Sequence, residues 1–223
     1  MLTNETLSRE TLPSGPAYAG DFETHVTVEP LGPTELDRFA QVCDELGVHA
    51  VLIELPRGAV RSQPMTRSNF RGTLPECHQS AITLANQLRK QGFAVSRIKI
   101  EAAPWNEDLP ETDLHAQGLP EENYFEYHVK LILAGETDLR EILRVCELRG
   151  AHLSANAFKR RDDGRFERFV TLRCPGVGRA TANQRAQDLE QSLRATGHEV
   201  GRMVCEYCVY DSNQNVDAEW LEP

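Results

Sequence analysis

Polar and apolar residues alternate along 23–29, where Val26 and Val28 share one face and polar residues share the other. This two-residue repeat is typical of a strand with one buried face, whereas apolar residues spaced by three and four indicate a helix. Thr34 is the predicted N-cap of the first helix, and Gly47 ends it. In the first half, these patterns predict strands at 23–29, 48–55, 65–73 and 95–102 and helices at 33–46 and 75–91.

The same succession returns in the second half of the chain. Phe22-Glu23-Thr24-His25-Val26 has a counterpart in Phe125-Glu126-Tyr127-His128-Val129. Shared apolar residues are what a repeated fold requires, but repeated Glu and His are not needed for packing, so they point to function. The second half is predicted to contain strands at 124–133, 151–158, 166–174 and 201–210 and helices at 137–149 and 180–196.

The order strand, helix, strand, strand, helix, strand is that of the ferredoxin-like unit. The sequence therefore predicts an α+β fold of two tandem ferredoxin-like βαββαβ repeats with pseudo-two-fold symmetry. Such a unit has strand order 4-1-3-2 and leaves one sheet face free of helices. That face is buried if the repeats pack sheet to sheet or make one continuous sheet, and a site is expected between the halves.

Composition divides the chain into five segments. The first and third are rich in polar residues, proline or acidic residues, which is typical of chain without its own core. The predicted segments are a disordered lead at 1–20, the first repeat at 22–103, an acidic, proline-rich linker at 104–121, the second repeat at 122–210 and a tail at 211–223.

Charge and hydropathy narrow the classes of partner. The formal net charge of the 223 residues is −10, which disfavours binding to duplex nucleic acid because such binding relies on many Lys and Arg contacts to phosphate. No apolar run is long enough to span a bilayer, and no signal-peptide pattern opens the chain, so a cytoplasmic protein without a membrane partner is expected. A small phosphorylated ligand in a local basic pocket remains compatible with this charge.

Ionisable residues gather on the predicted free face of the two sheets. If Val26 and Val28 face the helices, their polar neighbours in the same strand face the other way. The side chains placed on this face are Glu23, His25, Thr27, Arg97, Lys99 and Glu101 in the first half and Glu126, His128, Lys130, Glu167, Thr171, Arg173, Arg202 and Glu206 in the second.

Three interpretations of this face stay open. The Glu, His and Arg side chains can pair into a structural polar layer, since buried charges are tolerated when paired. Two carboxylates and one imidazole from each half also suit a divalent metal; those ligands would be Glu23, His25, Glu101, Glu126, His128 and Glu206. Alternatively, His can act as acid and base on a phosphate held by basic groups. Here the catalytic residues would be His128, His25, Lys130, Glu126 and Glu206, with Arg202, Arg97, Thr27 and Arg173 binding the anion.

His25-Val26-Thr27-Val28 resembles the His-x-Thr-x motif of the two-histidine phosphoesterases. That family cleaves cyclic phosphates or 2′-5′ linkages without a metal, using one such motif from each of two lobes. The resemblance implies that His25 and His128 form the acid–base pair and that Thr27 binds phosphate. The second motif departs from the family, because Lys130 stands where the family has Thr.

The chain as a whole is similar to a family of uncharacterised bacterial proteins with a duplicated ferredoxin-like unit. The stretches that carry this resemblance are Ser62-Gln63-Pro64-Met65, Lys99-Ile100-Glu101 and Tyr210-Asp211-Ser212-Asn213. It covers most of 22–220 and implies a standalone module, with no activity to transfer. From the residues, we expect a hydrolase that handles a phosphate ester or nucleotide; the alternative is a non-catalytic metal- or ligand-binding module with a paired structural layer.

Overall fold

The computed structural model describes residues 12, 15–134, 139–156 and 163–221. The first half runs strand, helix, strand, strand, helix, strand. Its elements are β1 (Ala19–Val28), α1 (Pro33–Glu45), β2 (His49–Glu54), β3 (Ser62–Thr73), α2 (Leu74–Lys90) and β4 (Val95–Ala102).

The second half has the same order of long elements and ends in a short turn of helix. The elements after β4 are α3 (Asp113–Ala116), β5 (Tyr124–Leu133), α4 (Arg140–Arg149), β6 (Ala151–Asn156), β7 (Phe166–Pro175), α5 (Arg179–Ala195), β8 (Glu199–Asp211) and the 3₁₀ helix η1 (Gln214–Asp217).

The eight strands form one closed antiparallel barrel, in the order β1-β3-β2-β6-β7-β5-β8-β4. The predicted mixture of helices and strands is therefore confirmed, and the two groups of four strands are joined as one continuous sheet. Around the barrel, the first-half strands β4-β1-β3-β2 are followed by the second-half strands β6-β7-β5-β8. The groups meet where β2 pairs with β6 and where β4 pairs with β8.

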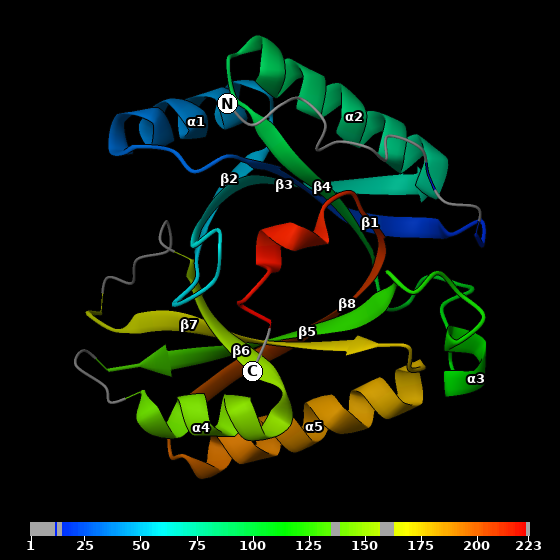
Figure 1. Ribbon diagram of the computed structural model, residues 1–223, viewed down its shortest axis with the longest axis vertical. Coiled ribbons are helices and arrows are strands. Elements are labelled where there is room, and N and C mark those ends of the chain that lie inside the picture. The colour runs from blue at the N-terminus through cyan, green and yellow to red at the C-terminus, as the bar shows by residue number, and fades with distance from the viewer. Residues whose placement is uncertain (1–11, 13–14, 135–138, 157–162, 222–223) are drawn as a thin grey trace.

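The helices cover the outside of the barrel and leave its interior to side chains from the strands (Figure 1). α1 and α2 lie over the first half, and α4 and α5 lie over the second. Val26 and Val28 are fully buried on the helix side of β1, so Glu23 and His25 point inward, as the alternation predicts. The apolar core therefore lies between helices and sheet, and charged residues line the inside.

Local chemistry sets where the first helix begins. The N-cap of α1 is Gly32, whose N–H donates to Glu35 Oε2 at 3.0 Å. The prediction of Thr34 as N-cap is wrong, because Pro33 fits the first helical position, where its missing N–H leaves nothing unsatisfied. Thr34 is therefore the second residue of the helix.

The segments outside the two halves are described in part. Residues 1–11 and 13–14 of the predicted disordered lead lie outside the described residues, and β1 begins at Ala19, within that lead. The predicted linker contains α3 and a buried Leu109. After β8, the chain turns back so that η1 lies inside the barrel (Figure 1). Among the described residues, no helix has both the length and the apolar character needed to cross a membrane.

Candidate functional site

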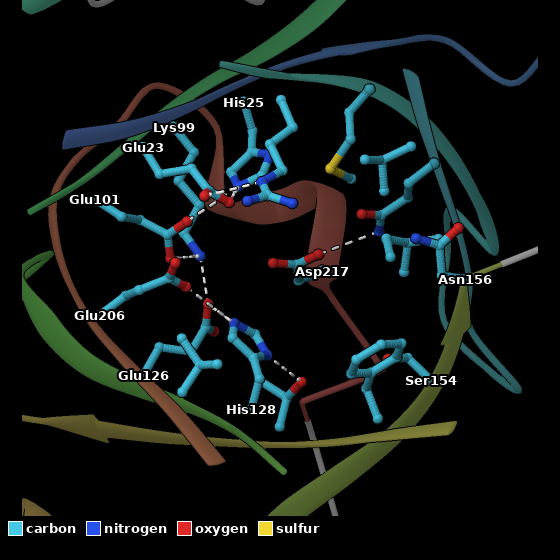
Figure 2. Close-up of a pocket in the computed structure, with 18 of the residues that line it drawn as sticks. Glu23, His25, Lys99, Glu101, Glu126, His128, Ser154, Asn156, Glu206 and Asp217 are labelled. Carbon is cyan, nitrogen blue, oxygen red and sulfur yellow. Dashed lines mark hydrogen bonds and ion pairs between the residues drawn. The ribbon is translucent and has the colours of Figure 1, made fainter. Parts of the chain in front are cut away.

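The interior of the barrel contains a cavity of about 480 Å³, lined by side chains from both halves. Figure 2 shows a cluster of carboxylates and imidazoles on one side, with Asp217 between this cluster and Ser154 and Asn156 opposite. Every residue named above as a candidate catalytic, anion-binding or metal-ligating residue lines this cavity. They are Glu23, His25, Thr27, Arg97, Glu101, Glu126, His128, Lys130, Arg173, Arg202 and Glu206.

In the first half, one imidazole lies between two carboxylates. His25 Nε2 is 3.2 Å from Glu23 Oε1 and 3.3 Å from Glu101 Oε2. Its Nδ1 is 3.1 Å from the backbone carbonyl oxygen of Thr66, an atom that can only accept. Both ring nitrogens therefore face acceptors, which favours the doubly protonated imidazolium.

The second half repeats this arrangement with looser distances. His128 Nε2 is 3.4 Å from Glu126 Oε2 and 3.5 Å from Glu206 Oε2, and its Nδ1 is 3.0 Å from Thr171 Oγ1. The strand register explains the repetition, because Glu126 lies opposite Glu206 on the neighbouring strand. In the first half, Glu23 lies opposite Glu101 in the same way.

Carboxylates that lie opposite each other on neighbouring strands repel, so cations must compensate them. Lys99 supplies one of these cations. Its ammonium nitrogen is 2.7 Å from Glu101 Oε1 and also pairs with Glu126. Together with the two imidazoles, it balances most of the negative charge buried in this part of the barrel.

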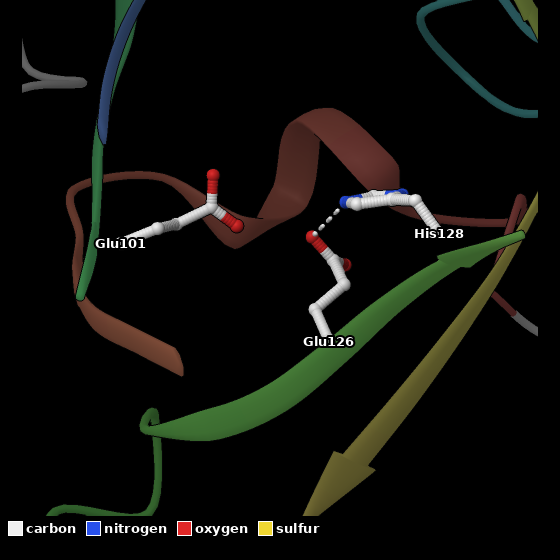
Figure 3. A group of neighbouring side chains, drawn as sticks. All are labelled: Glu101, Glu126 and His128. Carbon is white, nitrogen blue, oxygen red and sulfur yellow. Dashed lines mark ion pairs between the residues drawn. The ribbon is translucent and has the colours of Figure 1, made fainter. Parts of the chain in front are cut away.

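One group of these side chains has the spacing of metal ligands. Ligand atoms of Glu101, Glu126 and His128 all lie within 4.8 Å of one another (Figure 3). Two carboxylates and one imidazole can hold a divalent ion such as manganese or zinc. Because Lys99 pairs with the same two carboxylates, an ion at this position would compete with the Lys99 ammonium.

The acid–base properties of the cluster follow from burial and close charges. Burial favours the neutral imidazole, yet the hydrogen bonds and charges of Glu101 and Glu23 outweigh it and raise the pKa of His25 to about 10. Glu126 and Glu206 act in the same way on His128, whose pKa is also raised to about 10.

The pKa values of the carboxylates in this cluster are shifted in opposite directions. Burial acts to raise the pKa of Glu101, but the charge of Lys99 and the hydrogen bond from His25 lower it to about 2. For Glu206, burial and the charge of Glu101 raise the pKa, and they outweigh the nearby His128. Glu206 is therefore the carboxylate of this cluster that accepts a proton most readily.

Two arginines on the cavity wall, Arg97 buried and Arg173 partly buried, bind a carboxylate from the C-terminal segment. Arg97 Nη1 donates to Asp217 Oδ2 at 2.9 Å, and Arg173 Nη2 donates to the same oxygen at 2.5 Å. Arg97 also pairs with Asp211, and Arg173 also pairs with Glu126. The predicted anion-binding residues Arg97 and Arg173 thus already hold anions of the protein itself.

The remaining predicted residues lie at the periphery of the cluster. Lys130 Nζ is 3.1 Å from Glu167 Oε2. The Thr27 side chain is buried, whereas Arg202 is exposed. These residues line the same cavity but are not in the central group of carboxylates and imidazoles.

Sequence reasoning did not identify Asp217 or its neighbours as site residues. Gln63 Nε2 donates to Asp217 Oδ1 at 3.1 Å, and Trp220 lines the cavity beside it. Asp217 follows the last strand, where no strand periodicity indicates a face. Gln63 precedes the predicted start of its strand, although the strand in fact begins at Ser62. Alternation from Met65 back to Gln63 would have placed Gln63 inward.

The comparisons with known proteins identify no family. No family model matches the sequence, and no curated protein matches it. A mutant chlorite dismutase from Candidatus Nitrospira defluvii has a similar structure over 85% of this chain and 92% of its own, at 10% identity and a TM-score of 0.29. A similarity of this size implies neither the fold nor the activity of that enzyme for this chain. None of the comparisons supports the resemblance to two-histidine phosphoesterases.

Proposed function

We propose that the protein binds and hydrolyses a small phosphate ester inside the barrel. The observation that carries the proposal is the contact between His128 and Glu206 on the wall of a cavity that basic side chains also line. Paired acid and base groups next to cations are what hydrolysis of an anionic ester requires. Groups of this kind, converging on the main cavity of a protein, mark a candidate active site.

In the proposed reaction, the two groups have opposite proton roles. Glu206 takes a proton from a water whose oxygen attacks phosphorus, and His128 gives a proton to the alcohol oxygen as its bond to phosphorus breaks. The pKa of His128, about 10, keeps it protonated at neutral pH, and an alkoxide is still basic enough to take that proton. The proton then returns from Glu206 to His128, which it contacts at 3.5 Å.

The other residues bind the substrate or hold the acid in place. Glu126 contacts His128 Nε2 at 3.4 Å and favours its protonated form. Lys130 and Arg202 line the cavity and would neutralise the phosphate oxygens. His25 occupies the equivalent position of the first half, where Thr27 would contribute a hydroxyl to the phosphate.

We also propose that the molecule has internal symmetry. We infer that the halves are tandem ferredoxin-like repeats related by a pseudo-two-fold axis. The order β4-β1-β3-β2 in one half and β8-β5-β7-β6 in the other supports it, since both correspond to 4-1-3-2. The recurrence of a Glu–His–Glu group at equivalent strand positions supports it as well.

The test is a screen of phosphate monoesters, diesters and cyclic phosphates with the wild type, His128→Gln and Glu206→Gln. Loss of either group should lower turnover by about 10²- to 10⁴-fold, as expected for a general acid or base. The matched control is His115→Gln, because His115 is exposed on α3 and outside the barrel. Full turnover in folded His128→Gln would overturn the proposal.

A second candidate function is the binding of a divalent metal, and the compact group of Glu101, Glu126 and His128 favours it. Elemental analysis of the purified wild type and of Glu126→Ala/His128→Ala tests it. Near-stoichiometric metal that is lost in the variant would identify a metal centre and would replace the metal-free mechanism. Wild type without metal, even after soaking in zinc, manganese and nickel, would leave the metal-free mechanism.

A further inference from the structure

We propose that Arg97, Arg173 and Gln63 form an oxyanion-binding subsite that the protein's own Asp217 occupies. In this inference, the phosphate or carboxylate group of a ligand binds the same donors and displaces the C-terminal segment. It deepens the proposed function and rests on it, because the subsite would hold the phosphate of the same substrate.

Three donors converge on the Asp217 carboxylate. Oδ2 accepts from Arg97 Nη1 at 2.9 Å and from Arg173 Nη2 at 2.5 Å, while Oδ1 accepts from Gln63 Nε2 at 3.1 Å. The donors come from β4, β7 and β3, so both halves of the barrel contribute. Guanidinium groups fixed in this way suit the planar or tetrahedral oxygens of carboxylate and phosphate.

The barrel itself retains these donors when Asp217 is removed. Arg97 keeps its ion pair with Asp211, and Arg173 keeps its pair with Glu126. Neither guanidinium is then left without a counter-charge, so an emptied subsite avoids the largest penalty of burying a charge. What remains is a set of free N–H groups at one point of the cavity, which an anion can satisfy.

The occupant belongs to a short segment that takes no part in the strand pairing of the barrel, although its Val216 and Trp220 are buried. Asp217 ends a four-residue 3₁₀ helix that follows the last strand. Beyond it, the Trp220 indole N–H donates to the Leu153 carbonyl oxygen at 3.2 Å, and the Ala59 N–H donates to the Ala218 carbonyl oxygen at 3.3 Å. Withdrawal of this segment breaks these contacts, the hydrogen bond from Gln63 Nε2 to the Val216 carbonyl oxygen and the packing of Trp220 on His152, but it leaves every pairing between barrel strands intact.

The position of the subsite fits the proposed reaction. Arg173 contacts both Asp217 and Glu126, and Glu126 contacts His128. An oxyanion in place of the Asp217 carboxylate is therefore one side chain away from the residues that surround His128. Phosphate offers more acceptor oxygens than a carboxylate, so it can use all three donors and still present an ester bond to the cluster.

The experiment measures binding of inorganic phosphate by titration calorimetry to the wild type, Asp217→Ala and Asp217→Asn. Asp217→Ala empties the subsite and should bind phosphate about tenfold tighter than wild type or more, whereas Asp217→Asn keeps it filled and should gain little. Asp217→Ala/Gln63→Leu, which lacks one donor, should lose most of the gain. Acetate and chloride at equal ionic strength separate phosphate, carboxylate and non-specific anions as the preferred ligand.

Phosphate binding by folded Asp217→Ala that is no tighter than by wild type would overturn the inference. If Asp217→Ala does not fold, the fluorescence of the Trp105→Phe variant tests whether phosphate displaces the C-terminal segment. This substitution removes the exposed tryptophan of the two in the chain and leaves the buried Trp220 as reporter of the C-terminal segment. Phosphate should then shift the Trp220 emission to the red; unchanged emission at saturating phosphate would contradict displacement. Neither phosphate binding nor Trp220 emission requires turnover, so both still test the subsite if the hydrolysis screen is negative.

Discussion

Lys99 on β4 and Glu126 on β5 form an ion pair inside the barrel, although β8 lies between their strands. Both side chains are buried, with relative exposures of 7% and 1%. Lys99 also pairs with Glu101 of its own half. One ammonium group thus holds two carboxylates from opposite halves of the molecule at a short distance.

Replacing Lys99 by Met should destabilise the fold strongly. The change leaves Glu101 and Glu126 buried without the cation they share, and breaking a buried pair in this way costs about 3–5 kcal/mol. The free energy of unfolding from urea titrations measures the loss. Lys90→Met is the control, because Lys90 is exposed at the end of α2 and its replacement should change stability by less than about 0.5 kcal/mol. Equal losses in the two variants would contradict this account of Lys99.

The strand pattern predicts where the imidazoles lie and which carboxylates lie beside them, but it does not predict the cations that pair with those carboxylates. A strand has a period of two, so burial of Val26 is enough to turn His25 to the opposite face. The same period does not reveal which carboxylate will contact which cation, since pairing depends on distances across strands. Asp217 is harder still to predict, because it lies in a turn beyond β8 where side chains have no fixed face.

Closure of the barrel was also only one of two arrangements compatible with the sequence. The junction between β2 and β6 consists of two register pairs, Ile53 with Asn156 and Glu54 with Ala155. Because this pairing is so short, the sequences of β2 and β6 have the same pattern of polar and apolar residues that two free edge strands would have. The elements could therefore be predicted from local patterns, whereas the joining of the halves depends on contacts between distant residues.

Lys99→Met should also create a site for a divalent cation. Glu101 and Glu126 then lose their ammonium, while His128 remains close enough to complete a set of three ligands. Zinc or manganese should raise the melting temperature of this variant more than that of the wild type. Metal at 100 times its dissociation constant contributes about 2.7 kcal/mol. Lys99→Met/His128→Gln should lose this response; a response equal to that of Lys99→Met would exclude His128 as a ligand.

Gly58→Ala should loosen the C-terminal segment. Gly58 has φ of +111°, and a Cβ atom there would lie 3.1 Å from Trp220 Cβ and 3.2 Å from the Ala218 carbonyl oxygen. Gly47→Ala is a matched control, because Gly47 has φ of +71° but no atom within 4 Å of the added Cβ. Both changes carry backbone strain of about 1–2 kcal/mol, and Gly58→Ala adds the clash with the segment.

Thermal melting and quenching of Trp220 fluorescence by iodide, both in a Trp105→Phe background, separate these two effects. Gly47→Ala should lower the melting temperature without exposing Trp220. Gly58→Ala should also make Trp220 accessible to iodide. If quenching is the same in both variants, the loop around Gly58 does not hold the segment.

His152 should make stability fall as the solution becomes acidic. Its ring packs against Trp220 with centroids 5.5 Å apart. Burial, followed by the charges of Arg57 and Arg173, lowers the pKa of His152 from 6.5 to about 4. The unfolded chain therefore takes up a proton at a higher pH than the folded protein does, so stability is fully present above pH 6.5 and is lost as the pH falls towards 4.

His152→Phe keeps an aromatic ring beside Trp220 and removes the titration. From pH 7 to pH 4, the wild type should lose about 1–2 kcal/mol more stability than this variant, which is less than the full shift corresponds to because solvent screens the partly exposed ring. Urea unfolding at a series of pH values measures the difference, and the common titration of other groups cancels in it. A difference that stays constant with pH would show that His152 is protonated equally in the folded and unfolded chains, and the packing against Trp220 would then carry no pH dependence.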